Sequence, residues 1–321
     1  TLARAFQKTL RVQKSDIEFQ TIFLNKVVNC AESLVQHNHY ELAFRECFER
    51  FTDQFLKFQD RNTPYESSPP NPGESWFRRV NIVMRFYHVR SICLYKLASA
   101  RDAHFARIDT VMDVRDALRD LQRAAEFFNK QSEIVREQCY AGLYNITTTT
   151  MQICRALRVS EYHTITPPFL SYMLASTQTT ICLLQPQFYA WRVKLGTELA
   201  IACESNNCLA DSLAVVTTML KYFHDIEETE KMAPPLPAEL ENILQASKQQ
   251  LTLLQLKYKF WLGELDAAAI MSEAAKMDEK AQVKDSRFVL PLLLECLQLA
   301  RGLQGRYAPP RSDIPGGLND A

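Results

Sequence analysis

The chain has 321 residues, 47% of them hydrophobic and 23% charged, which is the composition of a folded protein and excludes a wholly disordered one. Lysine plus arginine and aspartate plus glutamate number 37 each, and this balance argues against a dedicated nucleic-acid binder or a polybasic membrane clamp. Only 8 residues are glycine, and because sheets, barrels and phosphate-binding loops need glycine in their turns, the composition favours an all-α fold.

Residues 1–59 are expected to form an N-terminal helical hairpin. From Ile17 to Val35 the apolar residues recur at steps of three and four, as in an amphipathic helix. Residues 37–39 break this pattern, and a second helix is predicted from Tyr40 to about Phe58. Residues 60–75 contain four prolines, one glycine and three serines, so they predict a proline-rich linker.

Residues 76–225 are expected to form a central helical array. The periodicity and the breaks predict helices over about 76–100, 109–129, 132–157, 169–184, 187–205 and 208–224. Gly142 and the run Thr147–Thr150 weaken the helix at 132–157, since glycine and β-branched residues are poor helix formers. Acidic residues and prolines over 226–237 then predict a second linker.

Residues 238–304 are expected to form C-terminal helical hairpins. Helices are predicted at about 238–261, 265–279 and 286–303, with a turn at Gly263. Residues 305–321 hold three prolines and three glycines and predict a disordered tail. Because the chain begins at Thr1 without a methionine, we expect it to be a piece of a longer protein.

The turns suggest how these helices are arranged. Ala43, Ala214 and Ala268 each lie a few residues after a turn. Tetratricopeptide-type hairpins have a small residue at such a position, and it lets their two helices approach closely. These alanines are 171 and 54 residues apart, which is not a multiple of the regular repeat of about 34 residues. An irregular α-solenoid of stacked helical hairpins is therefore predicted, and a large bundle with a single core is the competing architecture.

Catalytic and cofactor motifs are absent from the sequence. It contains no glycine-rich phosphate loop, no H-E-x-x-H metal motif and no nucleophile elbow. We therefore predict that the protein is not an enzyme, binds no cofactor and has no metal site. His37 and His39 with Cys30 and Cys47 offer a possible zinc set, but without tight paired spacing a polar turn beside two core cysteines is the favoured interpretation.

The nine cysteines point to a reducing compartment. Their number is odd, no two form a CxxC pair and most lie in apolar stretches, which does not fit a secreted disulfide framework. Cys203 and Cys208 lie on either side of one turn, and packing is preferred to a redox role for them. No stretch of about 18 apolar residues is present, so no membrane-spanning helix is expected.

Two regions are candidate partner-binding surfaces. Segment 76–136 carries 12 lysine or arginine residues and 7 acidic residues, a balance that suits an acidic partner surface, although a solvated helix face is the favoured alternative. The helix pair at 169–192 adds aromatic side chains that look exposed, while core anchoring is preferred for the tryptophans. The candidate residues are Trp76, Arg78, Arg79, Arg85, Tyr172, Tyr189 and Trp191.

Two blocks of sequence resemble a known family. The block YELAFRECFERF at 40–51 is similar to a helical hairpin near the start of the cilia- and flagella-associated protein 54 family. The blocks FLSYMLAS at 169–176 and FYAWR at 188–192 are similar to a later segment of that family. Order and spacing agree over about 17–58 and 113–225, whereas the linkers, residues 60–110 and the tail agree poorly.

This resemblance implies a very large, non-enzymatic helical protein of the ciliary or flagellar axoneme. It implies a scaffold in the C1d projection of the central apparatus, with other central-apparatus proteins as partners, calmodulin in the same assembly and the central-pair microtubule nearby. The expected location is the cytoplasm and the axonemal cytoskeleton, with no nucleic-acid or membrane partner. The alternative is a cytosolic tetratricopeptide-like adaptor that binds peptide segments of other proteins.

Overall fold

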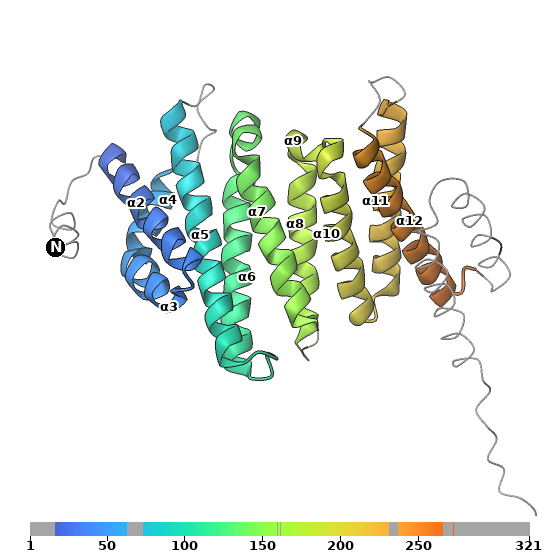
Figure 1. Ribbon diagram of the computed structural model, residues 1–321, viewed down its shortest axis with the longest axis horizontal. Coiled ribbons are helices and arrows are strands. Elements are labelled where there is room, and N and C mark those ends of the chain that lie inside the picture. Colours follow the sequence, from blue (N-terminus) through green and yellow to red (C-terminus); the bar gives the residue numbers. More distant parts are fainter. Residues whose placement is uncertain are drawn as a thin grey trace, which may run out of the picture.

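The computed structural model describes residues 17–62, 73–158, 160, 162–230, 237–265 and 272. Within these ranges every regular element is a helix and none is a strand, which confirms the all-α prediction. The helices follow one another in chain order along the longest axis of the molecule (Figure 1). In the described part of the chain, no helix is long and apolar enough to cross a membrane.

The first hairpin consists of α2 (Ile17–Gln36), α3 (Tyr40–Ala43) and α4 (Thr52–Asn62). A π-helical segment, Phe44–Phe48, and a 3-10 turn, Glu49–Phe51, join α3 to α4. The sequence predicts one regular helix here, so the π-helical segment is a difference that its apolar pattern does not reveal. Asn38 forms the turn with φ 61°, a left-handed conformation that asparagine tolerates better than most residues.

Three long helices follow: α5 (Glu74–Arg101), α6 (Ile108–Asn129) and α7 (Glu133–Leu157). Helix α4 continues to Asn62 and α5 begins at Glu74, so the segment between them is shorter at both ends than the predicted linker at 60–75. Helix α7 remains intact through its threonines. Thr147 and Thr148 both donate to the carbonyl oxygen of Tyr144, so their hydroxyl groups are satisfied within the helix.

The predicted helix at 169–184 is wrong, because two helices occupy this region. They are α8 (Thr166–Gln178) and α9 (Ile181–Leu184). Glu137 on α7 explains the break, since its carboxylate accepts hydrogen bonds from the backbone N–H groups of Ile181, at 2.7 Å, and Cys182, at 2.8 Å. A residue 44 positions away thus caps the start of α9, and this contact cannot be predicted from local sequence.

Helices α10 (Pro186–Ser205), α11 (Leu209–Glu230) and α12 (Ala238–Trp261) complete the described row. The bounds of α12 agree with the predicted helix, and Gly263 forms the predicted turn with φ 76°. Helix α11 continues to Glu230, so the predicted linker is wrong for residues 226–230. The helices predicted at 265–279 and 286–303 and the tail predicted at 305–321 fall almost entirely outside the described residues.

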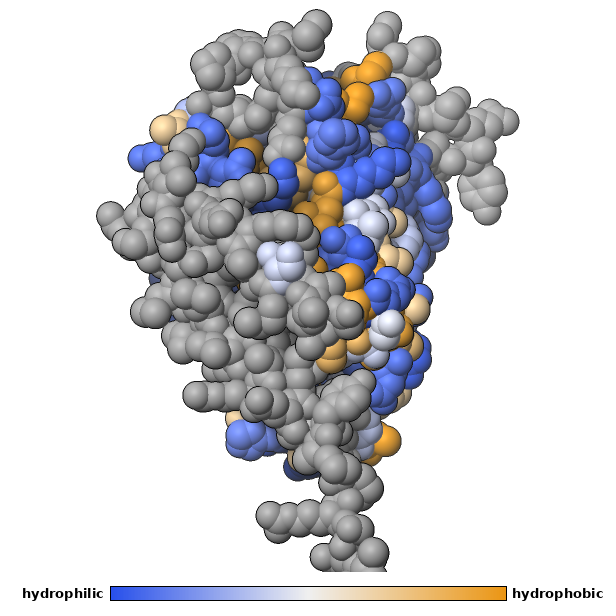
Figure 2. Space-filling view, turned by 90° about the vertical axis from the view of Figure 1, so that its right-hand side faces the viewer, coloured by the Kyte–Doolittle hydropathy of each residue, from blue (hydrophilic) through white to orange (hydrophobic). Residues whose placement is uncertain are grey.

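Packing between neighbours produces one core that extends along the whole row. Helix α5 packs on α6 and α7, α6 on α8, and α10 on α8, α11 and α12. Buried apolar side chains form a continuous cluster from Leu24 on α2 to Tyr258 on α12. The outermost described helix, α12, leaves Ile243 exposed, and apolar surface appears among hydrophilic residues on the face shown in Figure 2.

Candidate partner-binding surfaces

The start of α5 carries three of the candidate residues. Trp76 is half-buried and packs against the core. Arg78 is exposed and donates a hydrogen bond of 2.8 Å to Glu74, one turn earlier on the same helix. Arg79 is half-buried. An exposed pair within one helix contributes little to stability, so the Arg78 guanidinium can exchange Glu74 for an acidic group of another molecule at small cost.

Arg85 does not belong to this surface, because its guanidinium lies against α2. Its Nε donates to Glu32 Oε1 at 2.7 Å, and its Nη2 also bonds the other Glu32 oxygen. Nη1 donates to Asn25 at 3.0 Å and Nη2 to Asn29 at 2.6 Å. This side chain joins α5 to α2, and no local sequence pattern indicates the contact, since the partners are 53 to 60 positions away.

Most of the positive charge of segment 76–136 is neutralised within the molecule. Seven of its 12 cationic residues form ion pairs with acidic side chains: Arg78, Arg85, Arg90, Arg101, Arg107, Arg119 and Arg123. The excess of cations therefore does not make a basic face of the size that the sequence suggests. An acidic partner would meet isolated arginines with acidic neighbours.

The aromatic candidates of the second region are largely core residues. Tyr189 is fully buried, and its hydroxyl donates to the Met219 carbonyl oxygen on α11 at 2.5 Å. Trp191 is buried and lies 4.8 Å, between ring centroids, from Tyr144. Tyr172 is half-buried and its hydroxyl accepts from Asn129 at 3.2 Å. Of these three side chains, only Tyr172 retains surface that a partner could contact.

A buried arginine between helices was not found from the sequence. Arg192 on α10 is 2% exposed, and its guanidinium lies 4.9 Å from the ring centroid of Tyr222 and 6.0 Å from that of Tyr189. Burial lowers the pKa of Arg192, against the raising effect of the two tyrosines. The aromatic faces compensate part of the cost of burying this charge, so Arg192 acts as a packing residue of the α10–α11 pair.

A second buried charge joins α7 to α10. Glu198 is 8% exposed and accepts hydrogen bonds from Arg155 Nε, at 3.0 Å, and from Arg158. The adjoining cavity has a volume of about 10 Å³ and is lined by Glu198, Arg158, His163 and both polar and apolar neighbours. That space accommodates about one water molecule. It is too small for a substrate or a cofactor.

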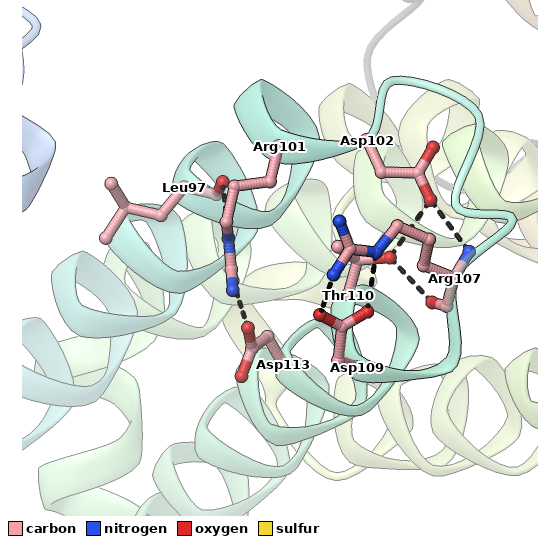
Figure 3. Close-up of polar contacts among 7 residues, drawn as sticks. All are labelled: Leu97, Arg101, Asp102, Arg107, Asp109, Thr110 and Asp113. Carbon is pink, nitrogen blue, oxygen red and sulfur yellow. Dashed lines mark hydrogen bonds and ion pairs between the residues drawn. The ribbon is translucent and has the colours of Figure 1, made fainter.

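The turn between α5 and α6 is held by a polar network (Figure 3). Asp102 accepts from the backbone N–H of His104 at 3.1 Å and of Arg107 at 2.8 Å, and from the Thr110 hydroxyl at 3.1 Å. These bonds lower the pKa of Asp102, with that from Arg107 as the largest cause. Arg107 and Asp109 form a two-point ion pair at 3.1 and 2.6 Å. The turn is thereby fixed in one conformation.

Phe105 lies at the centre of this turn in the left-handed region, with φ 50°. Its ring is 2% exposed and stacks on Tyr95, with 6.0 Å between centroids. The buried Ser160 hydroxyl donates to the Phe105 carbonyl oxygen at 3.0 Å. A left-handed phenylalanine is strained, and burial of its ring with this hydrogen bond maintains the conformation. The network serves the packing of three helices.

His37 and His39 lie at the polar turn of the first hairpin. His37 Nδ1 is 2.7 Å from the Ser33 carbonyl oxygen, and the Tyr40 hydroxyl donates to Asn38 at 2.6 Å. Across the described ranges, no three histidine, cysteine, aspartate or glutamate side chains gather in a way that could hold a metal ion. The eight cysteines in those ranges are free thiols. Nothing in these contacts resembles a catalytic constellation.

Comparison with known families decides what kind of protein these helices form. A family model described as cilia- and flagella-associated protein 54 matches residues 18–221, which is 204 of the 321 residues of the chain. The chain belongs to the cilia- and flagella-associated protein 54 family. A comparison with curated proteins gives no match.

The match to the cilia- and flagella-associated protein 54 family covers the structure from α2 into α11 as one span. The span includes residues 60–110, which lie between the two sequence blocks that agree best with the family. Helix α12 lies beyond the matched span but packs on it. Lys257 Nζ donates to both carboxylate oxygens of Glu204 on α10, at 2.8 and 2.9 Å, and the Tyr258 hydroxyl donates to the same carboxylate at 2.9 Å.

Proposed function

We propose that this chain is a structural scaffold segment of the ciliary and flagellar axoneme, within the C1d projection of the central apparatus. The observation that carries the proposal is the family match over residues 18–221. The row of helices with a continuous core supports it, since such a row presents long side surfaces for other proteins. The scaffold binds other central-pair proteins, in an assembly that contains calmodulin and lies near the central-pair microtubule.

We also propose that the row is an irregular α-solenoid. The described helices pack on those next to them or a few elements away in the chain, and none of them packs across the row from one end to the other. Of the turn alanines in the described residues, Ala43 is fully buried, as a close approach of two helices requires, whereas Ala214 is exposed. The protein acts by geometry, with no catalytic step, cofactor, nucleic-acid or membrane partner.

The partner surface that we propose is smaller than the sequence suggests. It comprises Trp76, Arg78 and Arg79 at the start of α5 and the outer part of Tyr172 on α8, because these side chains retain exposed or half-exposed atoms. Arg85, Tyr189 and Trp191 are excluded from it, since they stabilise contacts between helices. Charge reversal at Arg85 would therefore disturb the fold and would not report on partner binding.

Axonemal extraction tests the proposal. The full-length protein, carrying either the natural sequence or Arg78→Glu with Arg79→Glu, replaces the endogenous protein in motile ciliated cells. We expect the natural protein to remain with the axoneme after detergent and moderate salt, and the variant to be released at lower salt. Arg119→Glu is the matched control, because Arg119 is also an exposed arginine paired within its own helix, with Asp116 at 3.2 Å.

Two results would count against these proposals. A cytosolic tetratricopeptide-like adaptor would be lost from the axoneme with detergent alone, whichever variant is present. Unchanged retention of the double variant would remove the start of α5 from the contact surface. Cross-linking mass spectrometry on isolated axonemes then identifies the neighbours through the exposed lysines Lys57, Lys130 and Lys194. Cross-links only to outer-doublet proteins would contradict a place in the central apparatus.

A further inference from the structure

Exposed aliphatic side chains gather where α9 meets the start of α7. Ile134 on α7 and Ile181 and Leu184 on α9 are exposed. Helix α9 lies along the edge of the row at which α7 and α10 begin (Figure 1). The Glu137 carboxylate accepts from the backbone N–H of Ile181 at 2.7 Å, and Ile134 lies one turn before Glu137 on the same side of α7. The three aliphatic side chains are therefore neighbours on one surface.

Half-buried aromatic rings continue this surface along α7 and α10. Phe188 on α10 lies 5.8 Å from Tyr140 and 5.9 Å from Tyr144, between ring centroids, and all three rings retain exposed atoms. On α7 the apolar surface extends from Ile134 to Tyr144, which is about 15 Å, or nearly three helical turns. We call this surface the α7–α9 seam; it consists of Ile134, Tyr140, Tyr144, Ile181, Leu184 and Phe188.

The seam lies in a part of the chain that has few charges. Residues 138–197 include only five charged residues, whereas 23% of the whole chain is charged. The five are Arg155, Arg158, Glu161, Arg192 and Lys194. The core of a protein–protein interface is depleted of charge and enriched in aromatic residues, whereas a solvated helix face is charged or polar. The α7–α9 seam thus has the composition of an interface.

One end of the seam is positively charged. Lys194 lies one turn after Trp191 on α10, is exposed, and pairs with no acidic side chain in the described ranges. One turn further along α10, the single carboxylate of Glu198 is shared by Arg155 and Arg158. Three cations and one carboxylate therefore lie together at this end, so an acidic group of another molecule is attracted to it.

The opposite end of the seam is acidic. Glu133 lies one turn before Glu137 on α7 and next to Ile134, is exposed, and forms no ion pair within the part of the chain that the structure describes. The Glu137 carboxylate is held at the start of α9. The seam therefore has an apolar middle between ends of opposite charge, and this polarity selects both the kind of partner and its direction.

We propose that the α7–α9 seam binds an amphipathic α-helix of another axonemal protein, about three turns long. The apolar side chains of this helix recur at three and four residues and cover the seam, and acidic side chains near its C-terminus contact Lys194. It runs in the same direction as α7, because the negative end of its dipole then lies at Lys194 and the positive end at Glu133. The inference rests on the proposed scaffold function and adds a contact surface separate from the start of α5.

Two double variants of the full-length protein in motile ciliated cells test the apolar part. Ile134→Gln with Ile181→Gln removes side chains that are 51% and 58% exposed, and Ile108→Gln with Met112→Gln, on α6, removes two that are 67% and 45% exposed. We expect the first variant to leave the axoneme under detergent and salt conditions that retain the natural protein and the second variant. Equal retention of all three proteins would overturn the inference alone, whereas loss of the natural protein would overturn the scaffold function as well.

A zero-length carbodiimide cross-linker tests the charged end, because it joins an amine only to a carboxylate that it contacts. In isolated axonemes carrying the natural protein, Lys194 should be joined to an acidic residue near the C-terminal end of a partner segment with that apolar spacing. Lys194→Arg keeps the charge but has no amine, so it should remain in the axoneme and lose this product. The inference is wrong if Lys194 is joined only to acidic residues of this same chain, to a segment without that spacing, or to nothing. The natural protein decides this result even if a double variant fails to fold.

Discussion

Arg85 on α5 donates hydrogen bonds from two nitrogens to the two carboxylate oxygens of Glu32 on α2. Both side chains are about one-third exposed, at 29% and 32%, and two asparagines of α2 bond the same guanidinium. A planar guanidinium suits two-point pairing with a carboxylate. This contact joins the first hairpin to the central helices, so it is expected to set how strongly the N-terminal end of the row is held.

Replacement of Arg85 should therefore loosen α2. Arg85→Gln removes the charged hydrogen bonds and should lower the free energy of unfolding by about 1–2 kcal/mol. Arg78→Gln, which loses an exposed pair within one helix, should change it by less than about 0.5 kcal/mol. Urea unfolding of both variants measures the difference, and hydrogen exchange should locate the loss in α2. Equal effects of the two changes would contradict the assigned role of Arg85.

Two glycines lie against methionine side chains, and their replacement by alanine should change the stability of the protein differently. A Cβ atom at Gly196 on α10 would lie 2.8 Å from Met219 Cγ and 2.9 Å from its Sδ, whereas at Gly142 on α7 it would lie 2.8 Å from the terminal Cε of Met84. The end of a methionine side chain can move away easily, but Cγ is close to the backbone. Gly196→Ala should thus destabilise the protein by about 1–3 kcal/mol.

Gly142→Ala should be close to neutral or stabilising, by up to about 1 kcal/mol, because alanine is the better helix former and only the end of the Met84 side chain must shift, its Cε from 2.8 Å and its Sδ from 3.3 Å. Thermal melting of the two variants measures their loss of stability, and both variants carry the same substitution of glycine by alanine. A larger loss of stability at Gly142 than at Gly196 would contradict the close packing of Gly196 against Met219.

Asp120 should make stability fall as the pH rises. It is 1% exposed, and burial raises its pKa to about 6, while Arg90 and Arg123 act in the lowering direction. The folded state therefore holds this proton more tightly than the unfolded chain. The resulting stabilisation is complete below pH 3.8 and is lost as the pH passes about 6. The loss should reach about 3 kcal/mol.

Asp120→Asn should remove this dependence. Denaturant unfolding at several pH values between 4 and 7, with natural chain and variant side by side, gives the difference curve. The free energy of unfolding of the natural chain minus that of the variant should decrease as the pH rises. A flat difference curve would mean that Arg90 and Arg123 keep the carboxylate ionised throughout this range.

His88 should have the opposite effect in the same range. Its Nε2 lies 2.8 Å from the Thr149 hydroxyl oxygen, and burial lowers its pKa to about 4, against the raising effect of Glu32. The folded state therefore favours the neutral ring. This stabilisation is present above pH 6.5 and is lost as the pH falls towards 4, with a limit of about 3 kcal/mol.

His88→Gln keeps a group that can bond Thr149 but does not titrate. The natural chain should lose stability relative to this variant as the pH falls from 7 to 4, and an NMR titration of the His88 ring should place its midpoint near 4. A midpoint near 6.5 would contradict the burial of this ring between α5 and α7.

The sequence by itself determined the class of fold and most helix positions. The three- to four-residue periodicity, the scarcity of glycine and the prolines are local signals, and they located α12 at 238–261 and the turn at Gly263. The tertiary structure decided which side chains meet. Glu137 caps α9, Arg85 binds Glu32, and Tyr189 is buried against Met219, so part of the candidate surface belongs to the core. The physical reason is that a helix depends on neighbours along the chain, whereas burial and ion pairing depend on groups tens of residues away that only packing brings together.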